Sequence, residues 1–161
     1  MSLRIDFKLT GAGWAECTIA DGEQFCTITA SYLSDAFGDL VLSAVTLLHW
    51  FNSVSFSFLE EPGEFRWTLT AKTDNGVELA IVDPTYDRDS DEPLAEGGNV
   101  LFQTIVTRQA FGNAVLTAGK NLLEEHGEAG YLEKWIEYPF PTERLNELAR
   151  LIEATKKWNV T

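Results

Sequence analysis

Residues 53–70, SVSFSFLEEPGEFRWTLT, alternate apolar and polar side chains on both sides of a Glu-Glu-Pro-Gly sequence. Alternation with a period of two is typical of a β-strand with one buried face, and a Pro-Gly pair favours a tight turn. The stretch therefore predicts a β-hairpin. Its buried face carries Val54, Phe56 and Phe58 on the first strand and Phe65, Trp67 and Leu69 on the second.

A second hairpin is expected directly after the first in the sequence, around TDNG at 73–76. A three-residue loop, Asp74 to Gly76, pairs apolar residues with one another, because it places Ala71 opposite Leu79. The same register places Leu69 opposite Ile81. Gly76 would then be the left-handed residue of a β-bulge.

The N-terminal part of the chain predicts three more strands. Residues 3–9, LRIDFKL, alternate, and residues 14–29, WAECTIADGEQFCTIT, form two arms around Asp21-Gly22. A two-residue turn at that pair sets Ala20 opposite Glu23 and Cys17 opposite Cys26. The inward face then holds Ala15, Cys17, Ile19, Gln24, Cys26, Ile28 and Ala30, while Trp14 and Phe25 fall on the opposite, mostly polar face.

The only two cysteines of the chain, Cys17 and Cys26, would meet in this hairpin. We favour two buried, reduced thiols, because a disulfide across a tight hairpin constrains the unfolded chain little and a cytosol keeps thiols reduced. A disulfide remains an alternative. A metal or redox pair is a weaker one, since the sequence has no CxxC motif and no histidine at ligand spacing.

Three helices are expected. Ser34 is the predicted N-cap of a helix over 35–51 that is apolar on most sides, and Thr107 is the predicted N-cap of a helix that runs from Arg108 to His126 and stops at Gly127. The third covers 142–158, with a short helix and an extended turn at 130–141 before it. Gly112 and Gly119 weaken the second helix, so close packing against another element is expected there.

These elements predict a single α+β domain over residues 1–161, in the order βββ-α-βββ-β-α-α. The roughly seven strands would form one curved antiparallel sheet, or two meanders that meet, with the helices packed on a face.

Acidic side chains outnumber basic ones by 25 to 12, which gives a net charge of −13. Such a field repels phosphate backbones and anionic lipids, so nucleic acid and membrane are excluded as expected partners. The most apolar run, at 40–51, is also too short to span a bilayer. We expect a cytoplasmic protein whose charge either maintains solubility or attracts a basic protein partner.

The segment 83–99 is rich in acids, and Asp87, Asp89 and Asp91 have the spacing of the first three ligands of a calcium-binding loop. No glycine follows Asp91, and the twelfth position is Gly98 rather than Glu. No metal and no cofactor are therefore predicted.

Catalytic residues are not predicted either. His49 and His126 lie at expected helix ends, where a backbone bond, solvation or the helix dipole accounts for each of them. Glu60, Glu61 and Glu64 crowd a turn that is expected to be convex, and Arg66 is near enough to neutralise one of them. Common nucleophile, phosphate-binding and zinc motifs are missing from the sequence.

Exposed surfaces are the remaining candidates for a functional site. Aromatic side chains framed by acids make good protein contacts, although packing in the core is the alternative for each of them. The predicted interaction surface comprises Trp14, Phe25, Glu60, Glu61, Glu64, Tyr131, Trp135 and Tyr138, with Phe140 beside the last three.

Four stretches carry a resemblance: DGE at 21–23, YLSDAFGDL at 32–40, EEPGEFRW at 60–67, and EEHGEAGYLEKW through FP at 124–141. Together they resemble a family of small bacterial proteins, found especially in actinobacteria, for which no activity, cofactor or catalytic residue is established. The size and acidity are also similar to those of immunity proteins of bacterial toxin systems, which is an analogy only.

The first functional hypothesis is an acidic, non-enzymatic interaction module that binds a basic protein, in the manner of an immunity protein. The alternative is a small-molecule binding protein or hydrolase. Its cleft would lie between the sheet and the glycine-bearing helix, with His49 or a turn glutamate as the polar contact. A purely structural oligomer subunit is a third hypothesis.

Overall fold

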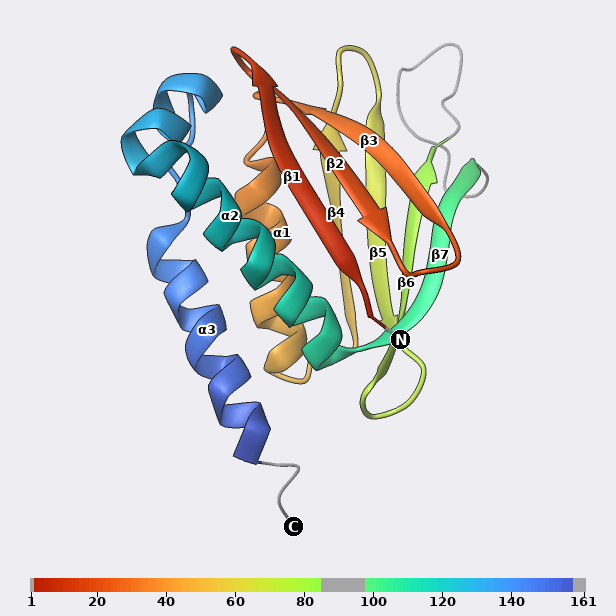
Figure 1. The fold of residues 1–161 in the computed structure, drawn as a ribbon. Coiled ribbons are helices and arrows are strands. Elements are labelled where there is room, and N and C mark those ends of the chain that lie inside the picture. Colours follow the sequence, from red (N-terminus) through yellow and green to blue (C-terminus); the bar gives the residue numbers. More distant parts are fainter. Residues whose placement is uncertain (1, 85–97, 158–161) are drawn as a thin grey trace.

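The computed structural model describes residues 2–84 and 98–157 and confirms the predicted α+β class (Figure 1). The element order is βββ-α-ββββ-α-α. The strands are β1 (Arg4–Gly11), β2 (Trp14–Ala20), β3 (Phe25–Ser31), β4 (Ser53–Leu59), β5 (Glu64–Ala71), β6 (Gly76–Asp83) and β7 (Asn99–Thr107), and the helices are α1 (Ala36–Leu48), α2 (Arg108–Trp135) and α3 (Thr142–Lys156).

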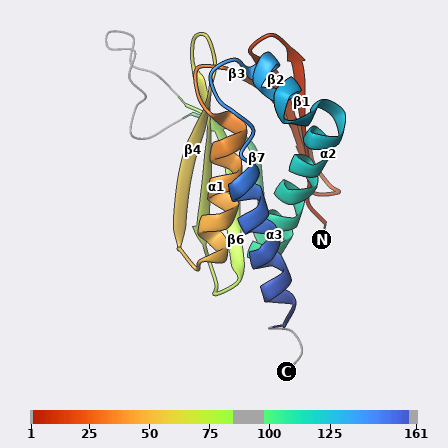
Figure 2. The same cartoon turned by 90° about the vertical axis from the view of Figure 1, so that its left-hand side faces the viewer.

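The strands form two antiparallel sheets rather than one. The first has the order β1-β2-β3 and the second β4-β5-β6-β7, so of the two predicted arrangements the one with two meanders is correct. The three helices lie side by side along one flank of the sheets, where α1 packs beside β4 and α2 beside β1 (Figure 2). Inward side chains of both sheets and of the helices form one hydrophobic core.

Away from the helices, the loop between β2 and β3 joins the two sheets. The Gln24 side chain donates a hydrogen bond to the Gln103 carbonyl of β7, with an Nε2–O distance of 2.6 Å. The neighbouring Asp21 carboxylate accepts a bond from Thr104, also of β7. Since β7 is an edge strand of its sheet, these bonds occupy part of an otherwise unpaired edge.

The hairpin at 53–70 forms as predicted, with Phe56 opposite Trp67 and Val54 opposite Leu69. The predicted register of the β2–β3 hairpin is wrong by two residues: Cys17 lies opposite Ile28, and Cys26 opposite Ile19. The cause is a four-residue loop. The Asp21 carboxylate accepts bonds from the backbone N–H groups of Glu23 and Gln24, each at 2.9 Å, and so widens the turn beyond Asp21-Gly22.

A shift of two residues leaves each side chain on its predicted face. Cys17 is buried and Cys26 half-buried, and both are free thiols, as favoured from the sequence. Burial raises the pKa of each thiol above its ordinary value. Gln24 is the exception on the inward face, because it belongs to the loop and is exposed.

The register of the β5–β6 hairpin also differs by two residues, since Ala71 lies opposite Val77 and Leu69 opposite Leu79. Gly76 begins β6 with an ordinary negative φ, so the predicted bulge is wrong. The loop is centred on Asp74 rather than Asn75, and the Lys72 N–H closes it by donating to the Gly76 carbonyl at 2.9 Å. Arg108 holds this arrangement, because the Asp74 carbonyl accepts from its Nε at 2.9 Å and the Asn75 carbonyl from its backbone N–H at 3.1 Å.

Helix α1 is buried on most sides, as predicted, but its N-cap is Asp35 rather than Ser34. The Asp35 carboxylate accepts a bond from the Gly38 backbone N–H at 3.2 Å. The Ser34 carbonyl instead accepts a bond from the Trp135 indole, with an Nε1–O distance of 3.2 Å. The helix therefore begins one residue later than the Ser34 hydroxyl group suggests.

Helix α2 begins at the predicted cap, Thr107, whose hydroxyl accepts a bond from the Ala110 N–H. Gly127 interrupts it with a φ of 66°, and a second helical segment continues to Trp135. Gly112 and Gly119 make the expected close contacts: a methyl group at Gly112 would lie 3.2 Å from Leu48, and one at Gly119 would lie 2.7 Å from Leu145.

The calcium-like residues Asp87, Asp89 and Asp91 lie outside the described residues. Across residues 2–84 and 98–157, no helix has both the length and the apolar character that crossing a bilayer requires.

Candidate interaction surface

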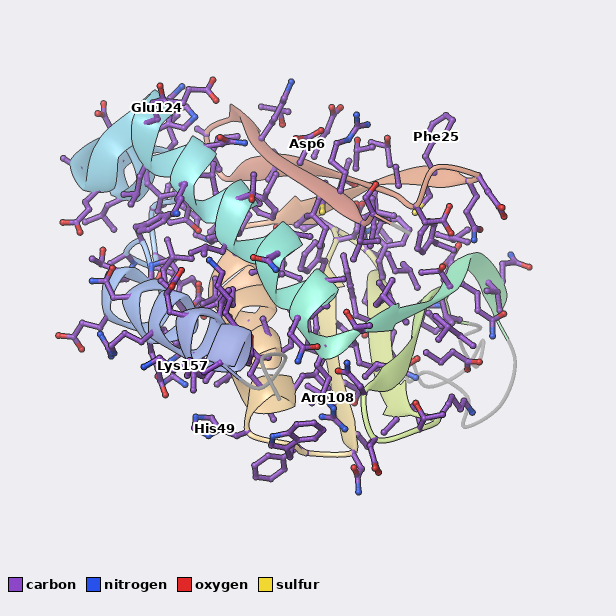
Figure 3. All side chains as sticks on the ribbon, turned by 60° about the horizontal axis from the view of Figure 1, so that its bottom comes forward. Asp6, Phe25, His49, Arg108, Glu124 and Lys157 are labelled. Atoms are coloured by element: carbon purple, nitrogen blue, oxygen red, sulfur yellow. The ribbon has the colours of Figure 1, made fainter. Side chains whose placement is uncertain are left out.

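The structure does not bring the predicted surface residues together. Trp14 lies opposite Ser31 at one end of the β2–β3 hairpin, and Phe25 lies opposite Ala20 at the other end. Six residue steps along a strand correspond to about 20 Å. Trp14 is half-buried, whereas Phe25 is 73% exposed and points away from the ribbon (Figure 3). Phe25 is thus an isolated apolar side chain rather than part of an aromatic patch.

The three glutamates of the β4–β5 turn differ from one another. Glu64 pairs with Arg66, with an Oε1–Nη2 distance of 3.2 Å, which identifies the carboxylate that this arginine neutralises. Burial raises the pKa of Glu60 above its ordinary value, and Glu61 is exposed. The turn therefore presents less free negative charge than its sequence suggests.

The aromatic residues of the 131–140 segment are mostly in the core. Tyr131 and Trp135 have no exposed surface and Phe140 is 5% exposed, while Tyr138 is half-buried. Tyr131 and Trp135 therefore cannot contact a partner directly, and their placement in the predicted surface is corrected to core packing. The aromatic side chains instead fasten the second segment of α2 to the rest of the protein.

Four contacts hold this segment. The Trp135 ring lies 6.2 Å from the Phe7 ring of β1, and its indole N–H donates to the Ser34 carbonyl at the start of α1. The Tyr131 ring meets Phe140 edge-on at 5.3 Å. The Lys134 carbonyl accepts a bond from the Gly13 N–H at 2.7 Å. The segment is consequently fixed against strand β1, the β1–β2 turn and the residues that lead into α1 and α3.

Fixing one side of the segment leaves its other side exposed. Leu132 and Ile136 are 43% and 49% exposed, and each follows a buried aromatic residue by one position. Glu133 and Glu137 are exposed beside them. We name these four residues, Leu132, Glu133, Ile136 and Glu137, the α2-end patch. It comprises the end of α2, which lies beside the tip of β1 in Figure 1, and the two residues that follow the helix.

The backbone at Ile136 has an uncommon geometry. Its φ is 79° and its ψ is −65°, and the Glu137 N–H donates to the Trp135 carbonyl across it at 3.0 Å. This is a γ-turn with positive φ, the rarer and more strained of the two γ-turn forms. A β-branched residue at positive φ is an outlier. Nothing in the spacing of the sequence indicates this turn.

Sequence reasoning also missed an aromatic pair, Trp50 and Phe51, which follows α1 and is 46% and 59% exposed. The Arg108 side chain packs against this pair. The buried guanidinium donates from Nη1 to the carbonyls of Leu47 and Phe51, each at 2.7 Å, and lies 4.9 Å from the centre of the Trp50 ring. The sequence signal that could have identified this pair is the occurrence of two consecutive aromatic residues at the end of a predicted helix.

The neighbouring histidine, His49, is the C-cap of α1 and is about half exposed. Its Nε2 lies 3.5 Å from the Glu147 carboxylate of α3. His126, at the other end of the molecule, lies 3.8 Å from Glu125 and has its imidazole mostly buried. His49 and Arg108 are found at the same end of the molecule in Figure 3, so neither faces the α2-end patch.

Buried polar groups gather where α1 begins, behind the α2-end patch. Burial and the nearby Asp35 carboxylate raise the pKa of Asp39 to about 6, and burial raises that of Asp35. Burial, with a smaller contribution from Asp35, raises the pKa of Tyr131. These shifts arise from desolvation.

A shallow groove of about 270 Å³ lies between β1 and α2. The strand contributes Arg4 and Asp6, whose side chains form an ion pair at 3.3 Å. The helix contributes the polar side chains of Asn113, Thr117 and Asn121, spaced four residues apart. The groove is located where the small-molecule hypothesis expects a cleft, but its lining contains neither His49 nor a turn glutamate.

Within the described part of the chain, no three His, Cys, Asp or Glu side chains cluster closely enough to hold a metal ion. No protein-family model, no curated protein and no solved structure matches this chain, so the family resemblance stays a prediction and the functional argument rests on the geometry of the chain itself.

Proposed function

We propose that this chain is an acidic, non-enzymatic interaction module of the bacterial cytoplasm that binds a basic protein and neutralises it in the manner of an immunity protein. The observation that carries the proposal is the pairing of rigidly held, exposed apolar side chains with exposed carboxylates. The α2-end patch combines two aliphatic side chains with two glutamates on one anchored segment.

The net charge of −13 supports the same proposal. An acidic surface steers a basic partner into encounter and raises the association rate, while apolar side chains that lose water on contact contribute most of the affinity. Binding by this mechanism is fast and depends strongly on salt, because mobile ions screen the exposed charges.

A random peptide library displayed on phage, panned against the purified chain at about 50 mM NaCl, tests the proposal. Enriched peptides are expected to be rich in Lys and Arg, and their affinity is expected to fall about tenfold or more at about 500 mM NaCl. A protein that contains such a segment is then assayed for loss of its own activity when the chain is added. Enrichment of neutral or acidic peptides, or of none, contradicts the proposal.

The groove between β1 and α2 favours a second candidate function, the binding of a small polar molecule. Its lining offers amide, hydroxyl, guanidinium and carboxylate groups within one open cavity, a combination suited to a ligand with several hydrogen-bonding groups. Thermal denaturation in the presence of a panel of polar metabolites tests it. A ligand that raises the melting temperature of the wild type, but not of Asn113→Ala/Asn121→Ala, supports this function, and an unchanged temperature for every ligand argues against it.

A further inference from the structure

We infer that the α2-end patch is the docking site for the basic partner, and that the partner covers it with an apolar depression bordered by Lys or Arg side chains. The inference rests on the proposed function and adds the place and the chemistry of the contact. Four observations support it: the arrangement of the apolar residues, their anchoring, the conformation of Ile136 and the local charge.

The apolar side chains of the patch come from the last turn of α2 and from the residue that ends it. The Ile136 N–H donates to the Leu132 carbonyl at 2.8 Å, so the two residues are joined through the backbone although Ile136 itself has non-helical φ and ψ. Ala129, which is also exposed, lies three residues before Leu132 in the helical segment. The exposed apolar residues therefore continue from the helix onto the γ-turn.

The patch is held in position before any partner arrives. Tyr131 and Trp135 are fully buried on the opposite side of the same segment, and the Lys134 carbonyl is bonded to Gly13. Thr142 of α3 donates a bond to the Glu128 carboxylate, which fixes the start of the segment. A partner therefore has little conformational entropy to remove from the backbone on binding.

The γ-turn places Ile136 on the surface rather than in the core. With its φ of 79° the residue is strained, and it remains 49% exposed, so about half of its apolar surface is left in water by the fold. A burial partner outside the chain would give the exposed isoleucine the apolar contacts that the fold does not provide.

The charge around the patch selects a basic partner. Residues 124–139 contain five glutamates and a single lysine. Glu133 and Glu137 alternate with the two aliphatic residues, so Lys or Arg side chains around an apolar depression would meet carboxylates on contact.

The exposed aromatic pair Trp50 and Phe51 fits a basic partner less well, because the Arg108 guanidinium lies 4.9 Å from the centre of the Trp50 ring. The Glu147 carboxylate near this pair lies 3.5 Å from the His49 imidazole. The α2-end patch instead has two exposed glutamates next to its aliphatic residues in the sequence.

The test uses the basic peptide that the phage selection enriches, synthesised with a fluorescent label, and the full chain. Fluorescence anisotropy gives its Kd for the wild type and for four sets of variants: Ile136→Gly, Leu132→Ser/Ile136→Gly, Glu133→Gln/Glu137→Gln and Trp50→Ser/Phe51→Ser. Phe25→Ser is the control for loss of an exposed apolar side chain elsewhere. Glu16→Gln/Glu23→Gln is the control for charge, because it removes the same two negative charges from a different surface. Circular dichroism shows whether each variant is folded.

The patch variants are expected to raise the Kd about tenfold for the double apolar change and about fivefold for the double glutamine change at about 50 mM NaCl, whereas both controls change it by less than about twofold. Ile136→Gly alone is expected to weaken binding while it remains folded.

Three other results each decide a separate point. A basic peptide that binds all patch variants as tightly as it binds the wild type overturns the docking site and leaves the proposed function intact. Weakened binding in Trp50→Ser/Phe51→Ser alone moves the site to the aromatic pair. A selection without basic peptides overturns the proposed function, and the docking site with it.

Discussion

Trp50 and Ile136 share a positive φ and an exposed side chain, and helix capping explains the first feature at Trp50 alone: its N–H donates to the Leu47 carbonyl and the Phe51 N–H to the Thr46 carbonyl, the bonds of a Schellman motif. In the described ranges they are the non-glycine residues with positive φ, at 65° and 79°, and both are large apolar residues with about half of their surface exposed. Positive φ costs a residue with a Cβ roughly 1–2 kcal/mol, and an exposed apolar side chain returns little of it. Strain and exposure at the same residue are more typical of binding sites than of scaffold positions.

Ile136→Gly is therefore expected to cost the fold little. Glycine adopts the positive φ without a steric cost, which should add roughly 1–2 kcal/mol, and the greater entropy of glycine in the unfolded chain removes about half of that gain. Loss of the half-buried isoleucine side chain removes roughly another 1 kcal/mol. We expect the free energy of unfolding, measured by urea denaturation, to change by less than about 0.5 kcal/mol.

Leu132→Gly is the matched control, because Leu132 is similarly exposed but lies at an ordinary position of the helical segment. It loses a similarly half-buried side chain and relieves no backbone strain, so it should lower the free energy of unfolding by about 2 kcal/mol. An equal loss of stability in Ile136→Gly would show that the γ-turn is not a store of strain.

Among the elements, α2 depends most on its glycines. Gly119 allows α3 to approach, since a Cβ there would lie 2.7 and 2.8 Å from the two methyl groups of Leu145. Gly130 has ordinary space around it, with the nearest atom, the His126 Cβ, at 3.5 Å from the added group. The same substitution at the two positions should consequently have opposite effects.

Gly119→Ala gains about 1 kcal/mol of helix propensity but must displace the buried Leu145 side chain, which costs typically 1–3 kcal/mol. We expect a net loss of about 1 kcal/mol. Gly130→Ala gains the helix propensity without the clash and should raise the free energy of unfolding by about 0.5–1 kcal/mol. Thermal and urea denaturation of the two variants measure both values. Equal stabilisation by both would mean that α2 and α3 separate at little cost.

The elements themselves could be predicted from the sequence, because period and caps are local signals. Thr107 as a cap, Gly127 as a break and the alternation of 53–70 all appear in the structure. The lengths and positions of loops could not be predicted, because they depend on side chains that bind backbone groups. Asp21 lengthens one turn through its own carboxylate, and Arg108, 34 residues from Asp74, bonds to the carbonyls of the other.

The sequence identified the segment that carries the candidate site, but not which of its residues are exposed. Composition marked 131–140 as aromatic and acidic, yet it does not say which side of a short helix faces inward. That choice is made by Gly13, Ser34 and Phe7, which come from distant parts of the chain and bind or contact Lys134 and Trp135. The exposed residues are therefore Leu132 and Ile136, one position after the aromatics.

The whole molecule has two groups of carboxylates with opposite effects on stability. Asp21 accepts backbone bonds from Gln24 and Glu23, which hold its pKa well below the ordinary value. Asp39 is half-buried near Asp35, and its pKa is raised to about 6 by burial and by that neighbour. The net charge of −13 adds repulsion that is strongest at neutral pH.

The sign of the pH dependence follows from these shifts. Between about pH 6 and its ordinary pKa of 3.8, Asp39 binds a proton more readily in the folded state than in the unfolded state, so acidification stabilises the fold. Below pH 3.8, Asp21 binds a proton more readily in the unfolded state than in the folded state, so further acidification destabilises the fold. Stability should therefore increase from pH 7.5 to a maximum in the range between these pKa values and decrease below it.

Urea denaturation at intervals of pH, on dilute protein because the pI is about 4.4, measures this curve. Asp39→Asn isolates the contribution of one carboxyl group: at pH 7 it should be more stable than the wild type by up to about 1 kcal/mol, since solvent screens a half-exposed group, and its curve should be flatter between pH 6 and 4. Glu124→Gln removes one charge from an exposed side chain of α2 and is the control for net charge. If Asp39→Asn and Glu124→Gln flatten the curve equally, the stabilisation on acidification comes from the overall charge of the molecule and not from the half-buried carboxylate at the start of α1.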